Sequence, residues 1–101
     1  MSESTMTTDE WGNKVWTNLK GQFHRIGGPA IEYPDGYKAW LINGKRHRLN
    51  GPAIEHSDGS KTWCINGELL GINDEGFWEL WDLLTPEQKQ DPILLSYLPT
   101  L

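Results

Sequence analysis

The segment HRIGGPAIEYPDGYKAWLINGKR at residues 24–46 is followed directly by HRLNGPAIEHSDGSKTWCINGEL at residues 47–69, and the two agree at 14 of 23 positions without a gap. Repetition at a fixed period is typical of stacked supersecondary units, none of which can bury its apolar face alone. A partial copy precedes them, because Gly12, Lys14 and Trp16 align with the glycine, lysine and tryptophan of both full copies. The sequence therefore predicts about two and a half repeats over residues 11–71.

Each full copy contains two turn signals of the kind that connect antiparallel strands. Residues 34–36 are Pro-Asp-Gly and residues 57–59 are Ser-Asp-Gly, which suits a type I turn followed by a left-handed glycine. Asn-Gly follows later in each copy and favours a second tight turn. The first turn places Glu32 opposite Lys38 and Ala30 opposite Trp40, and the second copy repeats this pairing. We therefore expect an antiparallel meander of β-hairpins.

The segment over residues 72–101 has helical rather than strand character. Apolar residues recur there with the spacing of one helix face, namely Phe77, Leu80, Trp81 and Leu84. Asn73 is a candidate N-cap for this helix, and residues 85–88 have the pattern of a capping box. Asp91 followed by proline predicts a further short helix. The fold class is thus mainly β, a hairpin-repeat meander capped by two or three short C-terminal helices.

Composition limits the classes of function. The formal net charge is −5 and the pI is about 5.0, which argues against a nucleic-acid binder with a basic patch and against membrane-surface binding. Residues 1–10 are polar, so we expect them to be disordered and not to be a secretory signal. Cys64 is the only cysteine, which excludes an internal disulfide and fits a small buried side chain. We expect a cytoplasmic protein without a membrane segment.

The repeated His-Arg pairs, at residues 24–25 and 47–48, are the main candidates for site chemistry. They could form a ladder for an anionic ligand, or the imidazoles could bond adjacent turns, and we favour the structural interpretation. A metal needs three or four converging ligands, and no cysteine or carboxylate stands at metal-ligand spacing from the two histidines. No arrangement of Ser, His, Asp or Cys goes beyond the presence of these residue types. We therefore expect no cofactor, no metal and no enzymatic activity.

Aromatic residues are the candidates for binding a partner. Tryptophans recur at Trp16, Trp40 and Trp63, where they could anchor a partner protein, although we favour a core under the C-terminal helices. The two full copies also differ at positions that repetition does not explain. The complete candidate set is Trp16, Trp40, Trp63, Tyr33, Tyr37, His56 and Trp78.

The pattern W-x-x-N-G-x-x-H-R-x-x-G-P-A at residues 40–53 resembles the MORN-like repeats of small proteins from bacteriophages and large viruses. The resemblance covers about residues 11–71 and departs from longer arrays in its small number of units. It implies a non-enzymatic protein-binding module. The most concrete expectation is a phage or mobile-element protein that binds and modulates a host protein such as a defence nuclease. The alternatives are a self-associating structural protein, including a homodimer, and a ligand-binding module that uses the His-Arg ladder.

Overall fold

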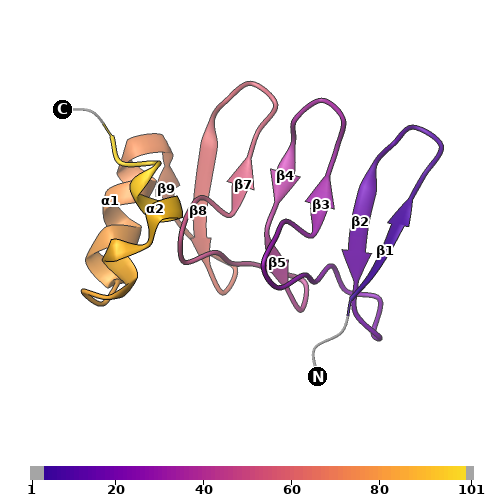
Figure 1. Ribbon diagram of the computed structural model, residues 1–101, viewed down its shortest axis with the longest axis horizontal. Helices are drawn as coiled ribbons and strands as arrows, with labels where there is room; N and C mark the ends of the chain where they lie inside the picture. The colour runs from indigo at the N-terminus through magenta and orange to yellow at the C-terminus, as the bar shows by residue number, and fades with distance from the viewer. Residues whose placement is uncertain (1–3, 100–101) are drawn as a thin grey trace.

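The computed structural model describes residues 4–99 and shows a row of β-hairpins with helices at its C-terminal end (Figure 1). Seven strands form one antiparallel sheet in the order β1-β2-β3-β4-β7-β8-β9, and β5 pairs with β6. The strands are β1 (Thr5–Thr8), β2 (Lys14–Thr17), β3 (Ile31–Glu32), β4 (Lys38–Ala39), β5 (Leu41–Ile42), β6 (Lys45–Arg46), β7 (Ile54–Glu55), β8 (Lys61–Ile65) and β9 (Glu68–Ile72). The helices are α1 (Asn73–Leu83), the 3-10 helix η1 (Gln88–Gln90) and α2 (Pro92–Leu95). The predicted mainly β meander with a helical end is confirmed.

The predicted turns have the expected geometry. In the β3–β4 turn, the Gly36 N–H donates to Tyr33 O at 3.0 Å, and Gly36 has a φ of 101°. In the second turn, Asn43 and Gly44 both have positive φ, at 49° and 82°, as a type I′ turn requires. The corresponding residues of the second full repeat behave alike. The turn sequences therefore determine the hairpins.

Charged side chains alternate in sign across five strands of the sheet. The register pairs Glu32 with both Lys14 and Lys38, and it pairs Glu55 with both Lys38 and Lys61. Each glutamate therefore has a lysine on either side, and the two predicted pairs within hairpins are confirmed. Cross-strand pairs of opposite charge contribute about 0.2–1 kcal/mol each.

The predicted pairing of Ala30 with Trp40 is wrong. The β3–β4 ladder ends at Ile31 opposite Ala39, and the Trp40 N–H donates instead to Ala53 O of the next repeat at 2.7 Å. Trp16 makes the same forward bond, to Ala30 O at 2.8 Å. The tryptophan position thus leaves its own hairpin and links one repeat to the next.

The N-terminal segment is more ordered than the sequence predicts. Residues 5–8 form β1, which pairs with β2 from Thr5 opposite Thr17 to Thr8 opposite Lys14. The prediction of disorder over residues 1–10 is therefore wrong for this strand, while residues 1–3 lie outside the described part. Three of the four β1 residues are threonine, which favours extended backbone, and a main-chain ladder requires no apolar side chain.

Two clusters of buried residues stabilise the chain. The first contains Ala30, Ile31, Ala39, Leu41 and Ile54 from the repeats. The second joins Trp63 of β8 to the helices through Phe77, Leu80, Leu84 and Leu94. The helices thus take over packing where the repeats end. Within residues 4–99, the helices are too short or too polar to cross a bilayer.

The helix starts follow the sequence with one exception. Thr85 and Gln88 make reciprocal capping-box bonds, and Asp91 Oδ1 accepts the Ile93 N–H at 2.8 Å at the start of α2. Asn73 does not cap α1, because its side chain accepts the Lys61 N–H at 2.9 Å and its φ is 55°. Its short amide tolerates this left-handed conformation at the junction between β9 and α1.

Candidate binding surface

An arginine of each full repeat stacks on the tryptophan of the preceding repeat. Arg25 Cζ lies 3.9 Å from the ring centroid of Trp16, and Arg48 Cζ lies 3.7 Å from that of Trp40. A guanidinium over an indole face is attracted by the ring quadrupole and excludes water from the ring. The recurring tryptophans therefore belong to inter-repeat clamps.

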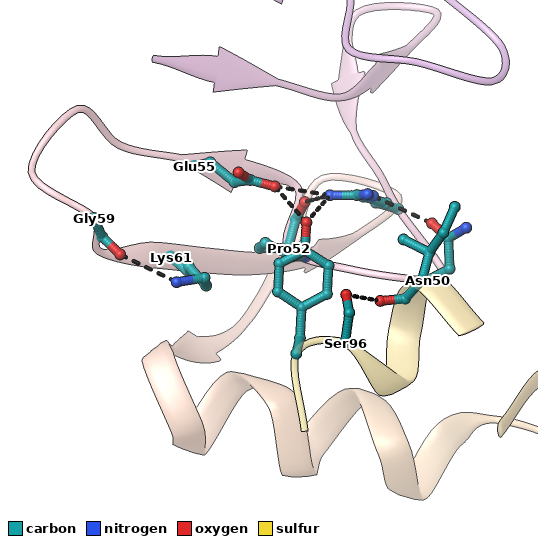
Figure 2. Close-up of polar contacts among 9 residues, drawn as sticks. Asn50, Pro52, Glu55, Gly59, Lys61 and Ser96 are labelled. Atoms are coloured by element: carbon teal, nitrogen blue, oxygen red, sulfur yellow. Dashed lines mark hydrogen bonds and ion pairs between the residues drawn. The ribbon is translucent and has the colours of Figure 1, made fainter. Parts of the chain in front are cut away.

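The clamp arginines also hold their own repeat, and Figure 2 shows the contacts that converge near Pro52 and Glu55 of the second full repeat. Arg48 Nη1 donates to Pro52 O and to Glu55 Oε2, both at 3.2 Å. The Arg25 contacts are equivalent, but they are more exposed, at 31% of the side chain against 9% for Arg48. Tyr97 of the C-terminal tail adds to the Arg48 clamp, which is the inner clamp of the two, since its hydroxyl donates to Glu55 at 2.7 Å. The clamp is therefore strongest beside the helices.

Two glycines make room for the guanidinium groups. A Cβ on Gly51 would lie 2.6 Å from Arg48 Cζ, and one on Gly28 would lie 2.8 Å from Arg25 Cζ. Heavy atoms do not approach this closely, so a side chain at either position displaces the arginine. The repeated H-R-x-x-G-P-A motif thus combines an arginine, the glycine over which it lies and the proline carbonyl that it reaches.

The repeated histidines bond adjacent turns, as the structural interpretation predicted. His24 Nδ1 accepts the Asn43 N–H at 3.0 Å, and His47 Nδ1 accepts the Asn66 N–H at 3.1 Å. An imidazole nitrogen that accepts a hydrogen bond carries no proton, so the neutral ring holds its proton on Nε2. Among the described residues, no three His, Cys, Asp or Glu side chains gather as metal ligands would.

Trp63 belongs to the core, and the prediction that it contacts a partner is wrong, because its side chain is buried. It is 1% exposed and meets Phe77 and Tyr97 edge to face, with ring centroids 5.6 and 5.9 Å apart. These aromatic side chains cover Trp63, whereas arginines cover the other two tryptophans of the series. The preferred core interpretation is thus confirmed for this member.

The non-repeated aromatic candidates form a short row along the hairpins. Tyr33 stacks on Tyr37 with ring centroids 5.3 Å apart, and Tyr37 meets His56 edge to face at 5.9 Å. Tyr37 also packs against the first core cluster, and His56 Nε2 lies 2.9 Å from Thr62 Oγ1. Only Tyr33 is classed as exposed in this row. Trp78 is separate from it, on α1 against Phe77 and Trp81.

A groove of about 420 Å³ lies between the repeat loops and the C-terminal helices. Its lining includes Arg25, Ile26, Trp40, His47, Leu49 and Ile93. Asn50 and Asp91 link the two sides, with Asn50 Nδ2 at 3.3 Å from Asp91 Oδ2. Trp40 is the only tryptophan of the predicted set that the groove includes.

The groove exposes large apolar side chains that sequence reasoning missed. Ile26 is 67% exposed, Leu49 is 42% exposed and Ile93 of α2 is 50% exposed. Ile26 and Leu49 follow the His-Arg pair at the same position of the two repeats, and this recurrence could have identified them. Ile93 carries no such signal. Apolar residues gathered at a concave surface are a feature of protein-binding sites.

Tyr97 gives the inner clamp a pH dependence. Burial, and then the hydrogen bond to Glu55, raise the pKa of the Tyr97 hydroxyl above its ordinary value of 10.0. The unfolded chain therefore loses this proton first as the pH rises. The resulting contribution to the free energy of unfolding is complete below pH about 10 and is lost as the pH rises through the folded pKa.

We therefore expect the free energy of unfolding of the wild-type protein to fall more steeply above pH 10 than that of Tyr97→Phe. Urea unfolding at several pH values between about 8 and 11 measures this difference. Parallel pH profiles for the two proteins would contradict the role given to Tyr97. Both proteins contain the same lysines and the same other tyrosines, so the difference between the two pH profiles reports on Tyr97 alone.

Comparison of the chain with protein-family models, curated proteins and solved structures found no match.

Proposed function

We propose that this chain is a non-enzymatic protein-binding module whose groove receives an apolar segment of a partner protein. The observation that carries the proposal is the exposure of Ile26, Leu49 and Ile93 around one groove. These aliphatic side chains come from three separate segments and keep 42–67% of their surface exposed in the isolated chain. Covering them with a partner removes apolar surface from water, at about 25 cal/mol per Å².

The polar lining of the groove suits a peptide segment. His47 and Gln88 line it together with the aliphatic residues and supply N–H donors. Such donors can bind main-chain carbonyl groups of an extended segment while the aliphatic residues take its side chains. Arg48 is already engaged by Pro52 and Glu55, so it acts as part of the groove wall.

The partner that we propose is a host protein, for a chain encoded by a phage or mobile element. The resemblance of the repeats to MORN-like proteins supports this proposal, and so does the hairpin scaffold, which holds the groove on short, clamped units. A defence nuclease or another host enzyme is the kind of target that such a small binding protein would modulate.

The double variant Ile26→Lys/Leu49→Lys is expected to lose the partner, because two charges would enter an apolar contact. The control is Leu19→Lys/Leu83→Lys, which adds the same charge at side chains that are 98% and 63% exposed and do not line the groove. Affinity capture with the wild-type protein and both variants compares the stoichiometric proteins recovered. Unfolding curves for all three check that the fold is unchanged.

Retention of the same stoichiometric partner by the groove variant would contradict the proposal. Loss of that partner in Tyr33→Ala, with binding by the groove variant intact, would move the site to the aromatic row. A wild-type protein that recovers no stoichiometric partner would remove the protein-binding function itself.

A further inference from the structure

The N-terminal edge of the sheet resembles the junctions between repeats, but no strand of the described residues 4–99 pairs with its outer side. At both internal junctions, the first strand of a hairpin pairs antiparallel with the last strand of the preceding hairpin, as β3 does with β2 and β7 with β4. β1 holds the position of β3 and β7 in the half repeat, and Figure 1 shows its hairpin at the end of the row. Its outer edge therefore has the geometry of a junction.

The register shows which main-chain groups β1 directs outward. The Asp9 N–H donates to Asn13 O at 3.1 Å, so hydrogen-bonded pairs with β2 fall at alternate residues from there, at Thr7 and Thr5. Met6 and Thr8 then direct their N–H and C=O groups away from β2. Met6 is equivalent to Ala30 and Ala53, whose carbonyl oxygens accept the inter-repeat bonds of the tryptophans.

β1 lacks the features that protect sheet edges. Its sequence is Thr-Met-Thr-Thr, without charge or proline, and all four residues are exposed. The other edge strand of the described sheet, β9, carries Glu68, has a register shift opposite Trp63 and Cys64, and leads directly into α1. An exposed edge strand that lacks a charge, a proline or a bulge pairs readily with another strand.

We propose that β1 pairs with β1 of a second copy, antiparallel across a twofold axis. Met6 lies opposite Thr8 of the second copy, and Thr7 lies opposite its own counterpart on the axis. In this register the outward N–H and C=O groups of Met6 and Thr8 all form hydrogen bonds with the second copy, and no like charges lie opposite each other. The sheet then continues through both copies. The inference is independent of the proposed function, because the groove does not include β1.

Sedimentation velocity from about 10 µM to about 1 mM tests the proposal. The wild-type protein is expected to shift towards twice the monomer mass as its concentration rises. Met6→Pro removes an outward N–H without removing a bond to β2, and is expected to weaken dimerisation at least about ten-fold. Met6→Lys places a charge on the edge, and Leu19→Lys is its control at a site that is 98% exposed.

Dimerisation that is lost in Met6→Lys and kept in Leu19→Lys would support the edge pairing even if Met6→Pro fails to fold. A wild-type protein that stays monomeric at every concentration would overturn the proposal. A dimer that survives both Met6 substitutions would overturn it as well, since the contact would then lie elsewhere. Partner capture by a monomeric protein would leave the proposed function standing.

Discussion

Gly76→Ala is expected to destabilise the protein by about 2–4 kcal/mol, although alanine in place of glycine usually stabilises a helix by about 1 kcal/mol. Gly76 lies in α1, and a Cβ there would collide with Trp63 Cδ1 and with Gly71 O. Trp63 is 1% exposed and packed in the second core cluster, so displacing it would disrupt that packing. Urea unfolding followed by tryptophan fluorescence measures the loss.

Glu79→Ala is the matched control, because Glu79 lies on the exposed side of the same helix. It is expected to change the free energy of unfolding by less than about 0.5 kcal/mol. If Gly76→Ala stabilised the protein as helix propensity alone predicts, α1 would not pack against Trp63 as described.

Arg48→Ala is expected to lower the free energy of unfolding by about 2–4 kcal/mol. The substitution removes the stack on Trp40 and the bonds to Pro52 and Glu55, and it leaves the Glu55 carboxylate without its cation. Arg25→Ala removes the same kinds of contact from a site that is 31% exposed, and is expected to cost about 1 kcal/mol. Chemical unfolding of both variants gives the comparison.

Arg48→Lys separates charge from shape in this clamp. A lysine keeps the positive charge but cannot stack a planar guanidinium on the indole, so most of the loss is expected to remain. Equal losses in Arg48→Ala and Arg25→Ala would contradict the graded clamp. Full recovery of stability by lysine would show that charge alone stabilises this position.

The hairpins could be predicted because their determinants are local. Asp35 and Gly36 set the first turn within five residues, and that turn alone fixes Glu32 opposite Lys38. The prediction failed where the pairing of a residue is determined by a strand outside its own hairpin. Trp40 bonds to the next repeat rather than to Ala30, and β1 is ordered by pairing with β2 although it contributes no core residue.

The site could be predicted only in part. The recurring tryptophans were correctly identified as a series, but their arginine partners come from the following repeat, nine residues after Trp16 and eight after Trp40. Tryptophan and arginine both recur at the repeat period, and this recurrence could have indicated that they pair between repeats. The groove has no comparable signal, because Ile93 belongs to a tail that is not repeated, and the docking of α2 is set by tertiary packing.

Hydrogen exchange of the protein with and without its captured partner tests the central claim most directly. The account predicts that the partner slows exchange at the amides of residues 26–28, of Leu49 and Asn50, and of α2, all of which line or flank the groove. Amides in the hairpin turns at residues 34–37 and 57–60 are predicted to exchange at the same rate in both states. Protection confined to these turns would contradict the account, because the partner would then bind the aromatic row and leave the groove open.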